Sequence, residues 1–550
     1  MSGRRDADVT GSRTGARALV ESLERAGAEV VFGYPGGNIV DVFDCIRTAK
    51  FKFVLGRHEQ GCVHMADGYA RASGRPGVVV VTSGPGAANT ITGLATANMD
   101  GVPLVLVSGQ VPLSQIGTDA FQEADMTGIC RAATKHSFLV KSANEIPETV
   151  AQAFYIATHG KPGTVVIDVP KNVQEEPAAA PYPERISLRA YHPEHAASTA
   201  QVNKLAKLLN EAKRPVVYAG GGVISANAAR DVAVLAKRAD IPVATTLMGI
   251  GSFDPEDPLA LGMAGVHGTF AANAAIAGAD LVLALGVRFN DRVTGDDIAR
   301  YAGKARIVHV DCDPSSIDKN VPAALGIVAD IKDLLTTVSS RVKPGDRRSW
   351  REKVAGWKKA RPLGYRPLHR NVIMPQAVVE EVDRATRGEA VLVTDVGQHQ
   401  MWCAQYLRHA RPRRFLSSGG MGTMGFAIPA AIGAAIARRD LKVVAVVGDG
   451  GAQMTAEELI VAAEEKLPVT FVVVNNRRLG MVRQMQATDF GRRYFATEIA
   501  SPDFVKLAQA YGVRGVRVSE PGKLAATIER AVRSKAPTLV EVLVEPEACV

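Results

Sequence analysis

Eight runs of apolar, mostly β-branched residues recur along the 550-residue chain and constrain its fold more than any other feature. Most of them end in Gly, Asn or Asp and lead into segments with helical periodicity. Continuous apolar strands that alternate with helices are typical of parallel sheets covered on both faces. We therefore predict an α/β protein of doubly wound parallel sheets, whose ligands bind beyond the carboxyl ends of the strands. The runs are residues 78–84, 102–109, 164–170, 214–222, 279–286, 391–397, 442–450 and 468–476.

Two stretches of different composition divide the chain. Residues 174–200 are rich in Pro and Ala, and residues 342–374 are basic and contain Trp350 and Trp357. If both stretches are linkers, the domains span about 1–180, 195–340 and 370–550. The length agrees with three domains, because a domain usually takes roughly 100–200 residues.

Composition argues against several classes of partner and location. No apolar stretch reaches the roughly 20 residues of a membrane helix, and the basic first residues lack the apolar core of a secretory signal. The formal charge of +9 is dispersed, with no Lys/Arg run interleaved with aromatics, so neither nucleic acid nor membrane is expected. The six cysteines are scattered, which predicts free thiols in a reducing compartment and a cytoplasmic protein.

The strongest single motif is Gly448-Asp449-Gly450, followed after residues 451–474 by Asn475-Asn476. A right-handed βαβ crossover brings the ends of the two strands to the same sheet edge. Carboxylate and amide oxygens there suit Mg²⁺ that also holds phosphate oxygens, and the glycines admit a diphosphate. Either pair alone is more often a simple turn. Together the pairs are similar to the signature of thiamine-diphosphate enzymes, and that resemblance names the cofactor.

A second glycine motif, 420–425, matches the GxGxxG pattern and precedes a helical segment. Alone it is a weak dinucleotide signal. We interpret it as a loop that lets a bulky ring come close, because the diphosphate already has a better site.

Glu59 is the candidate acid–base residue. The segment 51–60 runs from a strand into a helix, so Glu59 lies near a strand's carboxyl end. Thiamine chemistry needs a carboxylate against the aminopyrimidine ring, and burial would raise the pKa of such a group. Spacing alone favours a surface glutamate at a helix N-terminus; the thiamine signature elsewhere favours the proton-relay role.

Along nearly its whole length the chain resembles the catalytic subunit of acetolactate synthase (acetohydroxyacid synthase). The segments GTDAFQE (117–123) and RFNDRVTG (288–295) are far more specific for this family than the motif of Asp449 and Asn476, which all thiamine-diphosphate enzymes share. The matching segments are 31–38, 57–74, 82–97, 117–126, 134–140, 261–269, 288–295, 395–402, 417–433 and 475–484.

The resemblance implies a role for each matching position. Glu59 is the proton-relay carboxylate, Gln122 is a further catalytic residue, and Met424 is the apolar wedge that bends the cofactor. Asp449, Asn476 and the backbone of Arg478 hold Mg²⁺. The other thiamine-diphosphate residues are Val396, Gly397, Gln398, His399, Gly422, Gly450, Gly451 and Met481. The substrate residues are Phe121, Gln122, Lys171, Arg292, Met481 and Met485.

Arg292 suits the substrate carboxylate as a bidentate donor, although without the family a surface ion pair with Asp291 is the favoured interpretation. The middle segment resembles the family's FAD-binding domain, where FAD is mainly structural. Its implied flavin residues are Lys161, Gly220, Gly221, Gly222, Leu247, Met248, Gly262, Val266, His267, Gly286, Arg288, Asp291, Asp311, Asp313 and Asp330.

Three positions depart from the family pattern. Lys161 stands where an arginine is usual, and lysine cannot reproduce the guanidinium fork. Met485 replaces the tryptophan that favours 2-ketobutyrate over pyruvate as acceptor. Asn38 replaces a usual alanine at the mouth of the substrate channel.

The predicted activity is decarboxylation of pyruvate and transfer of the two-carbon unit to a second 2-keto acid, the first step of branched-chain amino acid biosynthesis. The resemblance implies a homodimer or tetramer with active sites between subunits, and a small regulatory subunit as a candidate partner. Three alternatives stay open: a pyruvate oxidase-like flavoenzyme, a carboligase of secondary metabolism with another acceptor, and a non-catalytic partner.

Overall fold

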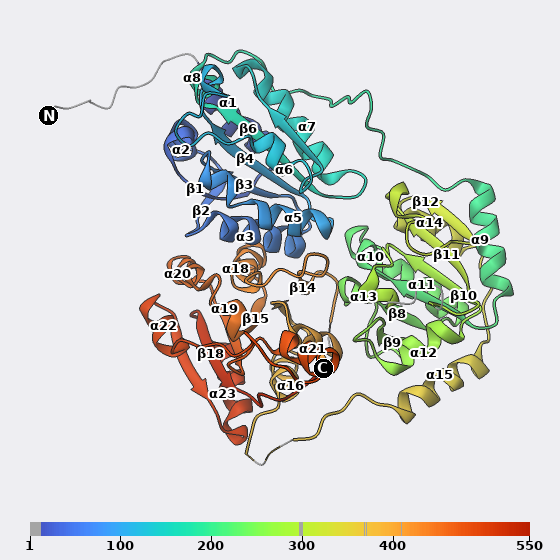
Figure 1. Cartoon of the computed structure of the whole chain (residues 1–550). Coiled ribbons are helices and arrows are strands. Elements are labelled where there is room, and N and C mark those ends of the chain that lie inside the picture. The colour runs from blue at the N-terminus through green and yellow to red at the C-terminus, as the bar shows by residue number, and fades with distance from the viewer. Residues whose placement is uncertain (1–12, 296–300, 368, 370, 409) are drawn as a thin grey trace. The chain divides into compact units, whose positions relative to one another are not determined.

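The computed structural model describes residues 13–295, 301–367, 369, 371–408 and 410–550. These residues form three six-stranded sheets that follow one another along the chain, coloured from blue to red in Figure 1. Their paired strands are parallel, which confirms the predicted α/β class of doubly wound domains. The basic first residues lie almost entirely outside the described residues.

The N-terminal sheet has the strand order β2-β1-β3-β4-β6-β5. Its strands are β1 (Val30–Tyr34), β2 (Lys52–Leu55), β3 (Gly77–Val81), β4 (Leu104–Gln110), β5 (His136–Leu139) and β6 (Thr164–Pro170). Its main helices are α1 (Gly15–Arg25), α2 (Val40–Ile46), α3 (Glu59–Ser73), α4 (Pro85–Ala88), α5 (Ile91–Met99), α6 (Met126–Cys130), α7 (Ile146–Thr158) and α8 (Lys171–Glu175). Strands β3, β4 and β6 are buried along their whole length, as continuous apolar runs require.

The middle sheet has the order β12-β11-β10-β7-β8-β9, so the chain adds strands on one side of β7 and then on the other. Its strands are β7 (Pro215–Ala219), β8 (Val243–Thr245), β9 (Ala260–Met263), β10 (Leu281–Leu285), β11 (Arg306–Asp311) and β12 (Leu325–Val328). Its helices are α9 (Thr199–Glu211), α10 (Gly221–Ser225), α11 (Ala229–Ala239), α12 (Phe270–Gly278), α13 (Asp291–Thr294), α14 (Ile331–Ser339) and α15 (Arg348–Ala360). This is the dinucleotide-binding order, whose switch point lies between β7 and β10.

The C-terminal sheet has the order β14-β13-β15-β16-β18-β17, which repeats the order of the N-terminal sheet. Its strands are β13 (Ala390–Thr394), β14 (Phe415–Ser417), β15 (Lys442–Gly448), β16 (Val469–Asn475), β17 (Arg514–Val518) and β18 (Thr538–Leu543). Its helices are α16 (Pro375–Thr386), α17 (Gln398–Tyr406), α18 (Ala427–Ala437), α19 (Asp449–Ala452), α20 (Leu459–Glu464), α21 (Gly480–Asp489), α22 (Phe504–Ala510) and α23 (Pro521–Arg533).

Helix α15 corrects the prediction of a linker over residues 342–374. Trp350 is buried in the core of the middle domain, and its indole N–H donates to the carbonyl of Pro215 at 3.1 Å. Trp350, Val354 and Trp357 follow one another at helical spacing, so they form one apolar stripe. The basic composition of this segment belongs to the exposed side of a packed helix.

Candidate functional site

Asp449 and Asn476 come from neighbouring strands of the C-terminal sheet, as the sequence predicts. Strand β15 ends at Gly448 and its neighbour β16 ends at Asn475, and the two strands are parallel and in register. Asp449 begins α19 and is only 2% exposed, whereas Asn476 is half-buried. Burial raises the pKa of Asp449 to about 6, against a smaller opposing effect of the Ser501 hydrogen bond. A buried carboxylate without a paired cation is costly, which favours a metal ion at this position.

The oxygens at this edge suit magnesium. Asn476 Oδ1 accepts a hydrogen bond from the backbone N–H of Arg478 at 3.0 Å, which fixes the amide and leaves a second lone pair. In the described part of the chain, no group of three His, Cys, Asp or Glu side chains is placed to hold a metal. A site here therefore combines one carboxylate with amide and backbone oxygens, a donor set that Mg²⁺ accepts when phosphate oxygens complete it.

Bare backbone surrounds the same edge. A Cβ at Gly450 would lie 2.9 Å from a Leu479 methyl and 3.3 Å from the Met424 methyl, so a larger residue would displace these side chains. Gly422 has φ +67°, and a Cβ there would meet only Val396, at 3.8 Å. The glycine loop 420–425 thus exposes backbone beside Met424, as expected for a close approach to a ring.

His399 supplies an unpartnered polar atom in this region. Its Nε2 is buried without a hydrogen-bond partner among the described residues. Burial lowers the pKa of His399 to about 4, so the imidazole is neutral. A Cβ at Gly448 would lie 2.9 Å from the His399 ring, and at Gly397 3.1 Å from it. An unsatisfied buried nitrogen against bare backbone fits a site that receives a ligand.

Asp395 was missed by sequence reasoning, although it lies at the end of β13. Its carboxylate accepts the backbone N–H groups of Gly425, at 3.0 Å, and of Val396, at 2.8 Å. A Cβ at Gly451 would lie 2.3 Å from Asp395 Oδ2. Burial raises the pKa of Asp395 to about 7. Asp395 therefore fixes the loop that follows Met424 and packs against the loop that follows Asp449.

The C-terminal residues of the chain are attached to the same domain. Gln398 Nε2 donates to Gln484 Oε1 at 2.8 Å and to the carbonyl of Ala548 at 3.0 Å, and Gln484 also contacts both backbone groups of Val550. Gln398 is thus engaged with the chain's own end. A Cβ at Gly480 would lie 2.1 Å from Gln398 Oε1 and 2.9 Å from Asn476 Nδ2, so Gln398 approaches the candidate metal ligand.

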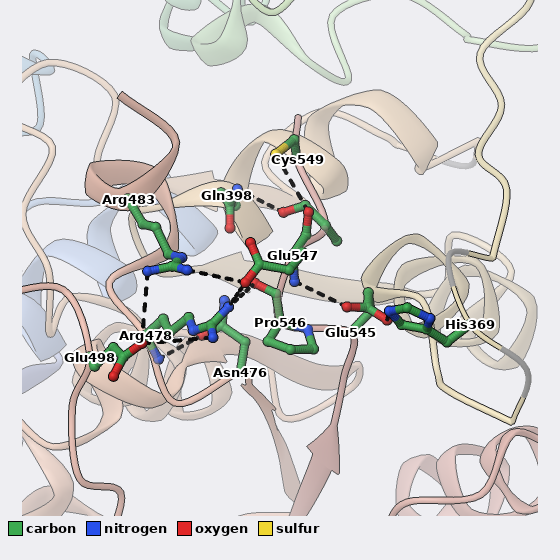
Figure 2. A network of polar contacts seen from close by, with 11 residues as sticks. His369, Gln398, Asn476, Arg478, Arg483, Glu498, Glu545, Pro546, Glu547 and Cys549 are labelled. Carbon is green, nitrogen blue, oxygen red and sulfur yellow. Dashed lines mark hydrogen bonds and ion pairs between the residues drawn. The ribbon is translucent and has the colours of Figure 1, made fainter. Parts of the chain in front are cut away.

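Two arginines near α21 hold the carboxylate of Glu547. Figure 2 shows Arg478 and Arg483 directed at Glu547, with Glu498 on their other side. Arg478 forms a short ion pair with Glu547, and Arg483 Nη2 lies 3.2 Å from the same oxygen. Burial alone would raise the pKa of Glu547, but the two arginines outweigh it and hold the pKa below its ordinary value. The chain end is thereby attached to the helix that carries the substrate candidates.

Those substrate candidates, Met481 and Met485, lie one turn apart on α21. Met481 is half-buried and Met485 is 40% exposed. The departure at position 485 therefore places a flexible thioether, rather than a rigid aromatic ring, on an accessible helix face.

In the N-terminal sheet, Glu59 begins α3, and three residues separate it from the end of β2. Its Oε2 accepts a hydrogen bond from Asn89 Nδ2 at 3.0 Å, a contact that the sequence did not indicate. A Cβ at Gly86 would lie 3.2 Å from Glu59 Oε1 and 2.7 Å from the Thr82 methyl. Thr82 Oγ1 is buried without a hydrogen-bond partner among the described residues. The edge thus combines an oriented carboxylate, bare backbone and an unsatisfied hydroxyl, which fits a bound polar ring.

The segment 117–123 is a tight loop closed on one carboxylate. Glu123 accepts backbone N–H groups from Gly117, in a short bond, and from Ala120 at 3.0 Å. The loop presents Phe121, 88% exposed, and Gln122, whose φ of 62° is left-handed. The loop thus places one apolar ring at the surface of the N-terminal unit.

Lys171 and Lys161 lie elsewhere in the N-terminal unit. Burial alone would lower the pKa of Lys171, but its contacts with Asp41 and Glu175 outweigh burial, and the pKa lies above its usual value. Lys171 is therefore a charged, paired group. The carbonyl of Lys161 accepts from Lys135 Nζ at 2.8 Å, while its half-buried side chain stays near the surface.

The predicted flavin residues of the middle domain gather at the switch point. Gly220, Gly221 and Gly222 follow β7, and Gly286 follows β10 with φ +61°. A Cβ at Gly222 would lie 2.7 Å from the Gly286 Cα, so the two loops meet backbone to backbone. A Cβ at Gly221 would lie 3.1 Å from the Met248 Cβ. Bare backbone at this point of this strand order fits a dinucleotide such as FAD.

Several of the remaining flavin candidates have local structural contacts. Asp330 accepts from the N–H of Asp333 at the start of α14, and Asp313 accepts from Ser315 N and Oγ. Asp311, buried at the end of β11, accepts from the N–H of Asp313. Leu247 shares a short 3₁₀ turn with Met248, Gly262 has φ +82°, and the Arg288 carbonyl accepts from Asn320.

Arg292 lies beside the loop that carries Val266 and His267. The Val266 N–H donates to the Arg292 carbonyl at 3.0 Å, and burial first, then the nearby Arg292 charge, lowers the pKa of His267. The Arg292 side chain forms an exposed ion pair with Asp291 at 3.3 Å. This is the surface pair that we weighed as the alternative. The structure thus brings one substrate candidate together with two flavin candidates.

These sites define a class of protein. The chain matches the family description "Thiamine pyrophosphate enzyme, N-terminal TPP binding domain" over residues 13–129, the central domain over 202–338 and the C-terminal TPP binding domain over 395–542. It is therefore a thiamine pyrophosphate enzyme, the class that the Asp449 motif predicts.

Curated relatives narrow the class. The chain is 44% identical to the acetolactate synthase isozyme 3 large subunit of Escherichia coli, with 97% of this chain and 95% of that protein covered. It is 43% identical to a probable acetolactate synthase large subunit of Methanocaldococcus jannaschii, with 97% and 92% covered. It is 43% identical to the mitochondrial acetolactate synthase catalytic subunit of Saccharomyces cerevisiae, with 97% and 81% covered. The chain belongs to the acetolactate synthase catalytic-subunit family, which confirms the resemblance.

Two further expectations can be compared with the structure. The six cysteines are free thiols, as predicted. Across the described ranges, every helix falls short of the length and apolar character needed to cross a bilayer.

Proposed function

We propose that this chain is the catalytic subunit of an acetolactate synthase. It decarboxylates pyruvate and transfers the two-carbon unit to a second 2-keto acid in branched-chain amino acid biosynthesis. Pyruvate as acceptor gives 2-acetolactate, and 2-ketobutyrate gives 2-aceto-2-hydroxybutyrate. The main support for this proposal is the position of Asp449 and Asn476 at the ends of neighbouring strands, in a chain that matches acetolactate synthases over 97% of its length.

The C-terminal domain holds the cofactor in this proposal. Asp449, Asn476 and the Arg478 carbonyl bind Mg²⁺, and the bare backbone at Gly450 and Gly451 receives the diphosphate. The remaining contacts are Val396, Gly397, Gln398, His399, Gly422 and Met481. When bound, thiamine diphosphate supplies an electron sink for the charge left by decarboxylation. Met424 supplies the apolar support on which the cofactor bends.

Glu59 and Gln122 are the acid–base and positioning groups of the N-terminal domain. The Asn89 amide holds one oxygen of the Glu59 carboxylate, so the other is directed toward the bare backbone at Gly86. A carboxylate at a fixed position can hold and return a proton at the cofactor's ring nitrogen, and it costs no reorganisation when it does so. Gln122 contributes hydrogen bonds from the closed 117–123 loop.

Charged and apolar side chains select the substrates. Arg292 binds the substrate carboxylate through its guanidinium group. The guanidinium can leave Asp291 for this purpose, because an exposed ion pair is weak. Lys171 lines the same substrate region, and Phe121 and Met481 supply apolar walls. Met485 stands where the acceptor is chosen. Because it carries no aromatic ring, a specialised carboligase with another acceptor is the second candidate function.

The middle domain binds FAD in a structural role, through the glycines at its switch point and the residues gathered around them. Those residues include Leu247, Gly262, Val266, His267, Arg288, Asp311, Asp313 and Asp330. Lys161 contributes to the same flavin without an arginine fork. We propose domain limits of 1–180, 195–340 and 370–550, with helix α15 packed as an addition to the middle domain.

A second copy of the chain completes the site in this proposal. The N-terminal domain of one subunit faces the C-terminal domain of the other, in a homodimer or tetramer. The exposed Phe121 is consistent with a surface that is covered in the assembly. Because the relatives are named large or catalytic subunits, a small regulatory subunit is the further partner.

A competition assay tests the function. Purified chain receives thiamine diphosphate, Mg²⁺ and FAD, then pyruvate and 2-ketobutyrate together, and both acetohydroxy acids are quantified. We expect both products to form and their ratio to report the acceptor preference at Met485. Absence of both products, with the cofactors bound, would contradict the proposal. Oxygen-dependent peroxide release would instead identify a pyruvate oxidase-like enzyme.

A further inference from the structure

Three polar residues without an assigned role lie behind the candidate metal site. Ser501 precedes α22, Asn475 is the last residue of β16, and Glu541 lies on the neighbouring strand β18. Asn475 and Glu541 are 3% and 2% exposed. Buried polar groups are expensive unless they are mutually satisfied, so such a cluster needs a physical reason.

Glu541 fixes the orientation of the Asn475 amide. Asn475 Nδ2 donates to Glu541 Oε1 at 2.7 Å, and an ionised carboxylate can only accept. The amide oxygen of Asn475 must therefore point the other way, where it accepts the backbone N–H of Arg477 at 3.0 Å. This assignment follows from the network itself.

The Arg477 bond stabilises an unfavourable backbone conformation. Arg477 has φ 56°, in the left-handed region that is unfavourable for a non-glycine residue. Asn475 closes a side-chain turn over this residue, and Asn476 does the same for Arg478. The strained turn presents Asn476 and the carbonyl of Arg478, the two candidate metal donors that follow β16.

Ser501 holds the third donor. Its hydroxyl donates to Asp449 Oδ2 at 2.9 Å, and Asn475 Oδ1 lies farther away, at 3.4 Å. One hydroxyl carries one proton, so the shorter contact to Asp449 takes it. A carboxylate has about four lone-pair positions, so this bond fixes Asp449 without preventing a cation from binding.

Arg517 ties the two supports together. Its Nε lies 2.6 Å from Glu541 Oε2, and its Nη2 lies 2.9 Å from Asp503 Oδ1. Asp503 follows Ser501 by two residues and caps α22. The loop that carries Ser501 is therefore linked to the strand that orients Asn475.

We propose that Ser501, Asn475 and Glu541 are positioning residues that set the affinity of the C-terminal domain for a divalent cation. The inference rests on the proposed metal site and extends it. Outer residues of this kind typically change metal affinity 10- to 100-fold when they are removed.

Ser501→Ala tests the inference on the full-length protein with thiamine diphosphate, using Mn²⁺ as the probe and electron paramagnetic resonance to count free metal. We expect about 10-fold weaker Mn²⁺ binding. Ser501→Thr, which keeps the hydroxyl, should restore affinity, and Glu541→Gln should weaken binding as well. Thr470→Val is the matched control, because it removes a buried hydroxyl from the opposite end of β16, bonded to the Ala531 carbonyl. Melting of each metal-free variant separates stability from affinity.

The outcomes are distinguishable. Wild-type protein that binds no Mn²⁺ with the cofactor overturns the proposed metal site, and this inference with it. Wild-type binding that Ser501→Ala leaves unchanged, or that Thr470→Val weakens equally, overturns the inference alone.

Discussion

The N-terminal and C-terminal sheets share one strand order, yet their carboxyl edges carry different chemistry. In the C-terminal sheet the third strand, β15, leads into Asp449 and two glycines. In the N-terminal sheet the equivalent strand, β3, leads into Thr82, Ser83 and Gly84. The helix after the second strand begins with Glu59 in one sheet, whereas in the other it follows Met424 and Gly425. The shared topology thus fixes where ligands bind, and single residues at strand ends decide what each edge can do.

The largest effect is expected from Glu59→Gln. The amide keeps the shape of the side chain but cannot exchange a proton, so turnover should fall about 10²- to 10⁴-fold. Cofactor binding should persist, because the C-terminal sheet holds the diphosphate. Product formation and cofactor binding are measured side by side. Glu148→Gln is the control, since Glu148 also lies in the first turn of a helix of this unit. Unchanged turnover in Glu59→Gln would remove the proton-relay role.

Asp449→Asn should impair cofactor binding at the carboxyl edge of the C-terminal sheet. It removes the only carboxylate of the proposed donor set, so Mg²⁺-dependent cofactor binding should weaken by at least about 100-fold, more than the loss of an outer residue. Titration calorimetry measures the binding. Asp440→Asn, an exposed aspartate paired with Arg438 in the same domain, should bind normally. Equal affinities in the two variants would contradict the metal role.

Met485→Trp sharpens the comparison at the substrate end of the C-terminal domain. A rigid aromatic ring should favour 2-ketobutyrate over pyruvate as acceptor by about 10-fold. The two acceptors differ by one methylene, and an apolar pocket discriminates one methylene by roughly this factor. The ratio of the two acetohydroxy acids in the competition assay measures this. Val482→Trp, an exposed position on the same helix, should leave the ratio unchanged. If the product ratio changed in Val482→Trp but not in Met485→Trp, position 485 would not determine the choice of acceptor.

The N-terminal and C-terminal sheets each bury a carboxylate with a raised pKa, Asp168 and Asp395, but their hydrogen-bond partners differ. Burial raises the pKa of Asp168 to about 7, against smaller opposing hydrogen bonds from Ser108 and Gln110. The unfolded value is about 3.9, so the folded state holds the proton more tightly. The stability that this group contributes is complete below about pH 4 and is lost as the pH rises to about 7.

Asp168→Asn removes this titration, and its amide can still bond Ser108 and Gln110. The free energy of unfolding of the variant should therefore rise by about 1–2 kcal/mol relative to that of wild type as the pH increases from 5 to 8. The difference between the melting temperatures of variant and wild type, taken at both pH values, measures this. Asp395→Asn should lose stability at both pH values, because the partners of Asp395 among the described residues are backbone N–H donors, and an NH₂ cannot accept from them. A pH-independent difference for Asp168→Asn would contradict the assignment.

The smallest effect is expected from Glu547→Gln. Glu547 is half-exposed, so its arginine contacts are screened and contribute less than about 1 kcal/mol. The change in melting temperature should be small at low salt and vanish at high salt. Glu529→Gln, which breaks an exposed pair with Arg533 on α23, is the control. A large, salt-independent loss would mean that the chain end supports the domain more than these contacts indicate.

Much of the fold was predictable because its central strands are continuous apolar runs, and strands buried on both faces need no partner to be recognised. The three-residue strand β8 and the partly exposed edge strand β17 carry weaker signals. Helix α15 was missed because its charged residues outnumber the residues of its apolar stripe. Its packing against Pro215 joins segments far apart in the sequence, so the composition of residues 342–374 does not reveal it.

The candidate site divides in the same way. Asp449 and Asn476 could be predicted because each stands beside a strand end within one βαβ unit. Ser501 and Glu541 could not, since their contacts join residues 52 and 66 positions apart. The same holds for Asn89, which reaches Glu59 across 30 positions. Only the folded sheet brings these pairs together.

The most direct test of the account is a mixing experiment with two inactive variants, Glu59→Gln and Asp449→Asn. If one subunit supplies Glu59 and its partner supplies Asp449, a mixed dimer contains one intact site. Subunits that exchange at random should then recover about a quarter of wild-type acetohydroxy acid production. Recovered activity would show that the two sheets act together across subunits. A mixture that exchanges subunits but stays as inactive as its components would contradict this division of roles.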